Sequence, residues 1–283
     1  MLELDLALEI ENFLKNLVVI KQIPDWQFKA ERLLTKKLQD LFSDTFKKTI
    51  SELKRVGVPS SDIQKKMIVS EIKGLEDKFK TVISETAVEA SNVSRGKILL
   101  TLGFPITEFS QQYSDLIANH IFVASQSTMD RLVGEVMDNL TRSYEDGLGI
   151  NEAAESLRSD FDSMQDYELK RIARTEIQSL QNEGAHLTIQ ELGVTYEQWW
   201  TAEDDRVRGN KPEDTADHVI LHGQIVRTSN PFSNGLMYPG DRSGPIEEWI
   251  NCRCRVVPFL MPEGYMAPLG LNSFYEYELE LAA

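Results

Sequence analysis

Both cysteines of this chain lie in one short motif, N-C-R-C at residues 251–254. Two thiols one residue apart could ligate a metal ion, form a disulfide, act as a redox centre or pack as a buried structural corner. A tetrahedral zinc site takes four ligands, and its cysteines usually lie two to four residues apart. The C-terminal half of the chain adds three histidines but no Cys-x-x-Cys arm. We therefore expect a buried structural corner without a cofactor, with His218, Cys252 and Cys254 as weak candidates for a metal site.

A second set of polar residues, R-T-E at 174–176, lies inside an apolar helical pattern. Arg174 and Glu176 point about 200° apart on a helix, so they do not pair with each other. Each needs a partner elsewhere, and we interpret both as ties to loops rather than as catalytic groups. Asp204 and Asp205 could form a carboxylate pair, although adjacent acids in a turn are commonly solvated or cap a helix. Neither a catalytic triad nor a phosphate-binding glycine loop can be assembled, so an enzyme is not expected.

The composition indicates a soluble globular protein, with 41% hydrophobic and 27% charged residues. No apolar run approaches the roughly 18 residues that cross a bilayer. The leucine-rich start is interrupted by acids, unlike a signal peptide, so we expect the chain to stay in a reducing cytoplasm, where disulfides are rare.

The net charge of −15 is unevenly distributed. Residues 1–160 carry 20 basic and 25 acidic side chains, which leaves −5, and residues 161–283 carry 10 and 20, which leaves −10. Sequence-independent DNA binding by the whole surface is therefore disfavoured, because it depends on Lys and Arg displacing counterions from phosphates.

Long helices are predicted to position the polar groups. Apolar residues recur at three- and four-residue steps over 26–56, 62–93, 113–148 and 165–192, and a short helix is expected at 152–161. The segment G-V-P-S-S-D at 57–62 ends the first helix and caps the next. Strands are predicted at 194–202 and 224–228, and a short helix at 213–221 that ends at Gly223.

One face of the first helix is basic. Lys29, Lys36, Lys47 and Lys54 fall together on a side roughly opposite the apolar face. A solvated helix face accounts for this pattern. The alternative is a stripe that contacts nucleic acid or an acidic partner.

These elements predict an α+β fold, in which a long helical N-terminal region precedes a small, loop-rich α+β C-terminal domain. We expect a helical arm or bundle at 1–150, the compact domain at 151–260 and a tail at 261–283. The tail could bind a partner as a peptide or pack back on its own domain.

Five ordered motifs resemble the C-terminal domain of the phage Mu protein F-like family. They are I-A-R-T-E with Q-N-E-G, then W-T-x-x-D-D-R-V-R, H-x-x-x-H-G-Q-I-V, P-G-D and N-C-R-C, and the matching run covers about 161–257. The motif residues that carry over are Arg174, Thr175, Glu176, Asp205, Arg206, Arg208, His218, Gly223, Asn251, Cys252, Arg253 and Cys254.

The resemblance implies a minor capsid or head-morphogenesis protein of a tailed phage or prophage. Such a virion component would lie inside the capsid near the portal, after assembly in the host cytoplasm. Its partners would be the portal protein, capsid or scaffold proteins and packaged double-stranded DNA, with no membrane and no catalysis. The helices of 1–150 would dock on the portal ring or capsid wall.

The resemblance also bears on the cysteines. Some relatives have cysteines in the turn that complete a zinc-like set, whereas this chain has Arg208 and Lys211 there. We therefore expect N-C-R-C to fasten the C-terminal segment to the helix and turn through charge-assisted hydrogen bonds. The alternative function is an enzyme acting on nucleic acid or a nucleotide, because this domain type also occurs joined to toxin modules.

Overall fold

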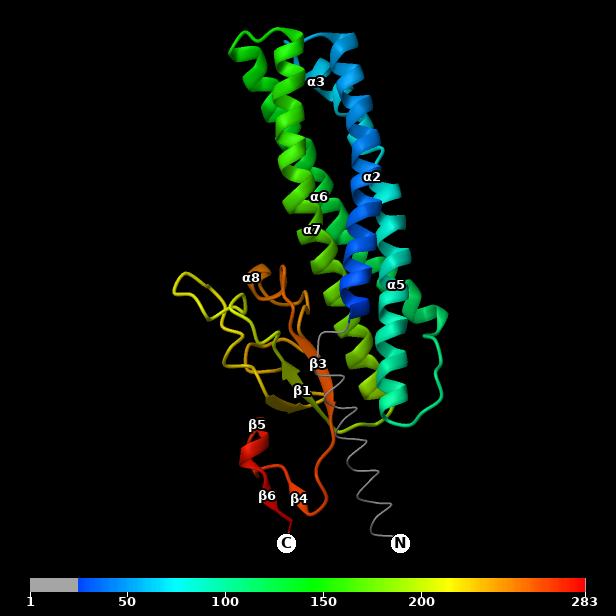
Figure 1. Cartoon of the computed structure of the whole chain (residues 1–283), viewed down its shortest axis with the longest axis vertical. Helices are drawn as coiled ribbons and strands as arrows, with labels where there is room; N and C mark the ends of the chain where they lie inside the picture. Colours follow the sequence, from blue (N-terminus) through cyan, green and yellow to red (C-terminus); the bar gives the residue numbers. More distant parts are fainter. Residues whose placement is uncertain (1–24, 283) are drawn as a thin grey trace. The chain divides into compact units, whose positions relative to one another are not determined.

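The computed structural model describes residues 25–282, and long helices precede short strands in it (Figure 1). The helices are α2 (Asp25–Val56), α3 (Asp62–Ile68), α4 (Ser70–Lys73), α5 (Glu76–Thr101), α6 (Gln111–Glu145) and α7 (Ile150–Glu191). The shorter elements are β1 (Tyr196–Trp200), β2 (Gln224–Arg227), α8 (Ile246–Trp249), β3 (Arg255–Phe259), β4 (Tyr265–Met266), β5 (Ser273–Tyr275), the 3-10 helix η1 (Glu276–Glu278) and β6 (Glu280–Leu281). The predicted α+β class is confirmed.

The described residues form two compact units. The helical unit comprises residues 31–86 and 111–173, and the sheet unit comprises residues 25–30, 87–110 and 174–282. Helices α5 and α7 each contribute residues to both units. Over residues 25–282, no helix is long and apolar enough to cross a membrane.

In the helical unit, α2 packs through its predicted apolar face. Phe42 meets Phe79 of α5 edge-on with 5.9 Å between ring centroids, and Phe46 stacks on Phe161 of α7 at 4.0 Å. The prediction of this helix is confirmed, including its end at Gly57, which takes a left-handed conformation with φ +88°.

Two helix predictions are wrong in their boundaries. The segment 62–93 belongs to three helices, because α3 ends at Ile68 and α4 ends at Lys73 before α5 begins at Glu76. The two helices expected at 152–161 and 165–192 are a single helix, α7. Residues 150–183 contain no Gly or Pro that would stop it.

The sheet unit contains an antiparallel sheet of strand order β3-β1-β2-β5, and β4 pairs separately with β6. The predicted strands at 194–202 and 224–228 are confirmed as β1 and β2. In the register, Trp199 of β1 lies opposite Val256 of β3, and Gln198 lies opposite Ile225 of β2. Glu197, Gln198 and Trp199 are all buried, so both faces of β1 are covered and its burial does not alternate.

The short helix predicted at 213–221 is wrong, because this segment consists of turns. The side chains of Asp214 and Asp217 accept hydrogen bonds from nearby backbone amides, among them those of Gly209 and Val219 at 2.9 and 3.0 Å. Local bonds of this kind compete with helix formation. The resulting loop places His218 inside the sheet unit, where it is 1% exposed.

The tail packs back on its own domain. Strand β5 pairs with β2, and the ring of Phe274 is 3% exposed and meets Phe259 edge-on. The hydroxyl of Tyr275 donates to the carbonyl of Ile220 at 2.5 Å. Of the tail aromatics, Tyr277 is the most exposed at 82%.

Candidate functional site

The R-T-E residues of α7 reach two separate loops. Arg174 Nη1 donates to Asn251 Oδ1 at 3.0 Å, and the backbone amide of Asn251 donates to Thr175 Oγ1 at 2.9 Å. Arg242 Nη2 donates to Glu176 Oε2 at 2.6 Å. The structure therefore brings Arg174 and Thr175 to the N-C-R-C motif and pairs Glu176 with the loop that follows P-G-D.

The next turns of α7 carry a buried polar face that binds loop backbone. Asn182 Nδ2 donates to the carbonyls of Pro239 at 2.7 Å and Cys254 at 2.9 Å, while its Oδ1 accepts from the amide of Val256 at 3.1 Å. Gln178 also donates to the carbonyl of Cys254. One amide side chain thus fixes two loops against the helix.

Ser179 belongs to the same face, and its Oγ donates to the carbonyl of Gly240 at 2.7 Å. Sequence reasoning assigned these polar residues no role, apart from the Q-N-E-G motif of the resemblance. The signal available in the sequence was polar residues at positions 178, 179 and 182, which recur at helical spacing next to the apolar stripe.

The turn after β1 is tied to the motif by Asp204 rather than by Asp205. The two terminal guanidinium nitrogens of Arg253 donate to the carboxylate of Asp204, with Nη2 and Oδ1 at 2.5 Å. Arg206 is exposed and also contacts Asp204, at 3.3 Å. The Arg253 guanidinium holds the pKa of Asp204 well below its usual range. Asp205, which the motif singled out, is exposed.

Two further motif residues, Arg208 and Gly223, donate hydrogen bonds to backbone carbonyls. Arg208 donates a side-chain hydrogen bond to the carbonyl of Ile250, directly before the motif. Gly223 adopts φ +79° and donates its amide to the carbonyl of Trp199 at 2.8 Å. The left-handed conformation explains a glycine at this position.

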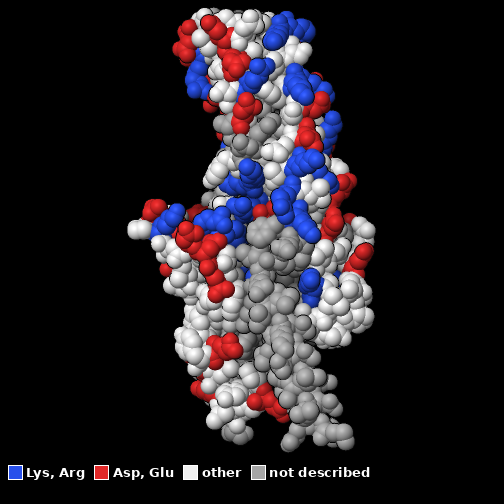
Figure 2. Space-filling model, viewed as in Figure 1, with Lys and Arg blue, Asp and Glu red and all other residues white. Residues whose placement is uncertain are grey.

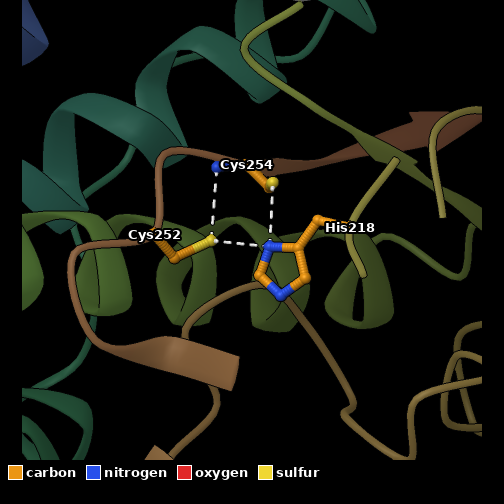
Figure 3. A group of neighbouring side chains, drawn as sticks. All are labelled: His218, Cys252 and Cys254. Atoms are coloured by element: carbon orange, nitrogen blue, oxygen red, sulfur yellow. Dashed lines mark hydrogen bonds between the residues drawn. The ribbon is translucent and has the colours of Figure 1, made fainter. Parts of the chain in front are cut away.

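Three buried side chains meet beside the motif (Figure 3). His218 Nδ1 lies 3.7 Å from Cys252 Sγ and 3.5 Å from Cys254 Sγ. The three residues are 1%, 2% and 3% exposed, respectively. The ring of Trp199 packs edge-on against His218 with 5.4 Å between centroids.

The opposite side of the His218 ring is held by a carboxylate. His218 Nε2 lies 3.1 Å from Glu248 Oε2, and Asn234 Nδ2 donates to the same oxygen at 2.9 Å. Glu248 belongs to α8, a short helix that was not predicted from the sequence. Thus α8 orients the imidazole.

The two thiols have opposite electrostatic tendencies. A hydrogen bond from Cys254, helped by His218, lowers the pKa of Cys252 against the effect of burial. Burial raises the pKa of Cys254, and the neighbouring Cys252 raises it further. Burial alone would lower the pKa of His218, but its hydrogen bond with Cys252 and the charge of that group outweigh it, so the pKa is raised.

This arrangement limits the chemistry of the cysteines. Both thiols are free and buried, so neither presents its sulfur atom at the surface of the described residues. Within the part of the chain that the structure describes, these three residues are the one group of at least three His, Cys, Asp or Glu side chains whose donor atoms lie within 4.8 Å. Thiolate and imidazole donors are the set that zinc prefers.

A second buried pair lies on the same helix and was not predicted. His186 Nδ1 lies 2.8 and 3.0 Å from the two carboxylate oxygens of Glu197 on β1. Burial raises the pKa of Glu197 to about 7, against the opposing effect of His186. His222, by contrast, is partly exposed and contacts Thr201 and Glu203.

The four lysines of the basic face lie along α2. Lys29, Lys36, Lys47 and Lys54 are all exposed. Their exposure agrees with a solvated face and with a contact surface alike.

Comparison with known proteins gives one family. Residues 134–257 match the model of the family described as phage Mu protein F like protein. The match begins inside α6, earlier than the run recognised from the motifs, and it ends in β3. No match was found among curated proteins or among solved structures. Over residues 134–257, the chain is therefore similar to the family described as phage Mu protein F like protein.

Proposed function

We propose that this protein is a minor capsid protein that acts in procapsid assembly together with the portal, without catalysis of its own. The observation that carries the proposal is the use of the family motif residues. Arg174, Thr175, Glu176, Asn251 and Arg253 all bind other parts of the sheet unit. Side chains used in this way hold loops in place and are not available to a substrate.

A docking role is supported by the helical unit. Its long helices carry exposed charges, and Lys and Arg side chains are frequent over them in Figure 2. Charged side chains on an exposed face favour encounter with a partner of opposite charge. We place the portal, capsid or scaffold protein against this unit, inside the capsid near the portal.

We propose packaged double-stranded DNA as a second partner, bound by the basic face of α2. The four lysines of α2 span 25 residues, which is about 38 Å along an α-helix. That length is close to one turn of B-form DNA, about 34–36 Å. Exposed lysines in one line are the observation that favours this contact.

The experiment is a co-purification with the portal and major capsid proteins of the same phage genome. We expect the full chain to bind the portal, and the triple variant K36E/K47E/K54E to bind at least about tenfold more weakly if the α2 face is the contact. The matched control K66E/K73E/K78E reverses three exposed lysines on α3, α4 and α5. It should bind like the wild type.

Two results would contradict the proposal. The first is no co-purification with the portal or the capsid protein at any salt concentration. The second is turnover of a nucleotide or nucleic acid that is lost in Glu176→Gln while the variant keeps its fold. The latter would favour the enzyme, because a carboxylate that only ties a loop leaves no activity to lose.

A further inference from the structure

The donor atoms of His218, Cys252 and Cys254 converge on one point from two separate loops (Figure 3). Typical bonds from zinc are about 2.3 Å to sulfur and about 2.0–2.1 Å to nitrogen. At a tetrahedral angle, two such bonds place sulfur and nitrogen about 3.6 Å apart. The observed Sγ–Nδ1 separations are 3.7 and 3.5 Å. Both sulfur–nitrogen pairs therefore already have the spacing of ligands around one zinc ion, and all three donor atoms lie within 4.8 Å of one another.

Hydrogen bonding alone leaves this cluster incomplete. When the ring proton lies on Nε2, the single lone pair of Nδ1 can accept a hydrogen bond from only one thiol at a time. Nδ1 nevertheless lies about equally close to both sulfur atoms. A metal ion bound between the three atoms would satisfy all of them at once.

The other ring nitrogen selects the tautomer that a metal requires. When His218 Nε2–H donates to Glu248 Oε2 at 3.1 Å, Nδ1 is left with a free lone pair that faces the sulfurs. Asn234 holds Glu248 in place by donating to the same oxygen at 2.9 Å. A carboxylate behind a ligating histidine is the usual outer support of a zinc site.

The surroundings also suit two thiolates. The backbone amide of Cys254 donates to Cys252 Sγ at 3.4 Å, and such a bond stabilises negative charge on sulfur. Arg208 and Arg253 are close enough to act electrostatically on the cluster. Two thiolates and one Zn²⁺ together carry no net charge, so the metal removes the cost of burying uncompensated anions.

We propose that His218 Nδ1, Cys252 Sγ and Cys254 Sγ form a zinc site in this protein. Binding releases the two thiol protons to solvent and involves no oxidation or reduction. The described residues supply three of the four ligands that a tetrahedral zinc site takes. The ion joins the loop that carries His218 to the segment that leads into β3, across 34 residues of sequence. Its role is to hold these two loops together.

The first measurement is elemental analysis of the untagged full chain, purified without chelators from zinc-containing medium. We expect about one zinc ion per chain. The variants C252S, C254S and H218N should each lose most of the zinc. The control H222N removes a histidine four positions away that contacts Thr201 and Glu203 instead, and it should keep the metal.

A second measurement covers the case in which a ligand variant fails to fold. Zinc is removed from the wild-type protein and Co²⁺ is added, and the absorption spectrum is recorded. Thiolate-to-cobalt charge transfer together with strong visible bands of tetrahedral cobalt is expected, and added Zn²⁺ should abolish both.

Two results would overturn the proposal. One is wild-type protein that contains no zinc and gives no thiolate–cobalt absorption. The other is folded H218N that retains as much zinc as H222N, because the metal would then lie elsewhere.

Discussion

Arg253 and Asp204 form the ion pair that joins the N-C-R-C motif to the turn after β1. Asp204→Asn removes the charge of the acceptor while keeping its shape. We expect a loss of about 1 kcal/mol in the free energy of unfolding, since the pair is partly exposed. Because the folded-state pKa of Asp204 is lowered, this contribution is present above the ordinary pKa of an aspartate and is lost on acidification. Urea denaturation at pH 7 and at pH 3 measures both effects.

The adjacent acid supplies the control for this prediction. Asp205 is exposed, so Asp205→Asn should change the stability by less than about 0.5 kcal/mol. Equal losses in Asp204→Asn and Asp205→Asn would mean that the ion pair does not stabilise the turn.

The buried pair of His186 and Glu197 predicts a second dependence on pH, with the opposite sign. The pKa of Glu197 is raised from 4.5 to about 7 by burial. Its contribution to stability is therefore full below pH 4.5 and is lost as the pH rises through 7. The shift corresponds to roughly 3 kcal/mol. Glu197→Gln should flatten the curve of unfolding free energy against pH between 4.5 and 7, measured by denaturation at each pH.

Glu247 provides a comparison because it is exposed on α8. Glu247→Gln should keep the pH dependence of the wild type. If Glu197→Gln and the wild type give parallel curves from pH 4.5 to 7, then Glu197 is not the group that titrates in this range.

At the scale of elements, the sequence pattern predicted those helices and strands whose formation depends on nearby residues. The apolar period of α2, its glycine end and the β-branched and aromatic run of β1 are features of short segments, and they were predicted correctly. The continuity of α7 was missed because two apolar stretches with a polar interval were interpreted as two helices. The loop of His218 was missed because Asp214 and Asp217 bind backbone amides there instead of supporting a helix.

In the site, too, the sequence indicated individual residues but not their distant partners. The sequence and its resemblance indicated Arg174, Glu176 and the cysteine motif, but pairing across 66 to 77 residues has no local signal. The role of Asp204 rather than Asp205 depends on which of two adjacent side chains points toward Arg253. The support of His218 by Glu248 depends on α8, a helix of four residues.

The approach of the P-G-D loop to α7 gives a prediction about elements. Gly240 has φ +89°, and a Cβ at this position would lie 2.9 Å from Ser179 Cα. Gly240→Ala therefore combines backbone strain with a clash against helix backbone, and we expect a loss of about 3 kcal/mol. Gly235→Ala has φ +85° but open space around the new Cβ, so it should lose only about 1 kcal/mol. Denaturant unfolding of both variants tests the difference, and equal losses would remove the close approach as its cause.

At the scale of the molecule, the segment that matches the family is not a complete packing unit. The core around Trp199 includes Ile98 of α5, and the sheet includes β5, both outside residues 134–257. Ser91 Oγ donates to the carbonyl of Leu180 at 2.8 Å, and a Cβ on Gly184 would meet Ser91 at 3.2 Å. Helix α5 is therefore part of the fold that presents the family motifs.

The net charge of the whole chain opposes binding to DNA by the surface as a whole. A net charge of −15 repels phosphates, so a contact with DNA needs a local basic surface, for which we propose the α2 lysines. Four phosphate contacts predict an affinity that falls about 100-fold between 50 and 200 mM salt. Fluorescence anisotropy with a labelled duplex measures this slope.

Reversal of Lys29, Lys36, Lys47 and Lys54 to Glu should abolish the salt-dependent binding, because it removes every contact in the proposed line. The K66E/K73E/K78E control should keep both affinity and slope, since it changes nearly the same charge elsewhere on the helical unit. If the control loses as much affinity as the stripe variant, the attraction reflects total charge. The basic face of α2 would then be an ordinary solvated surface.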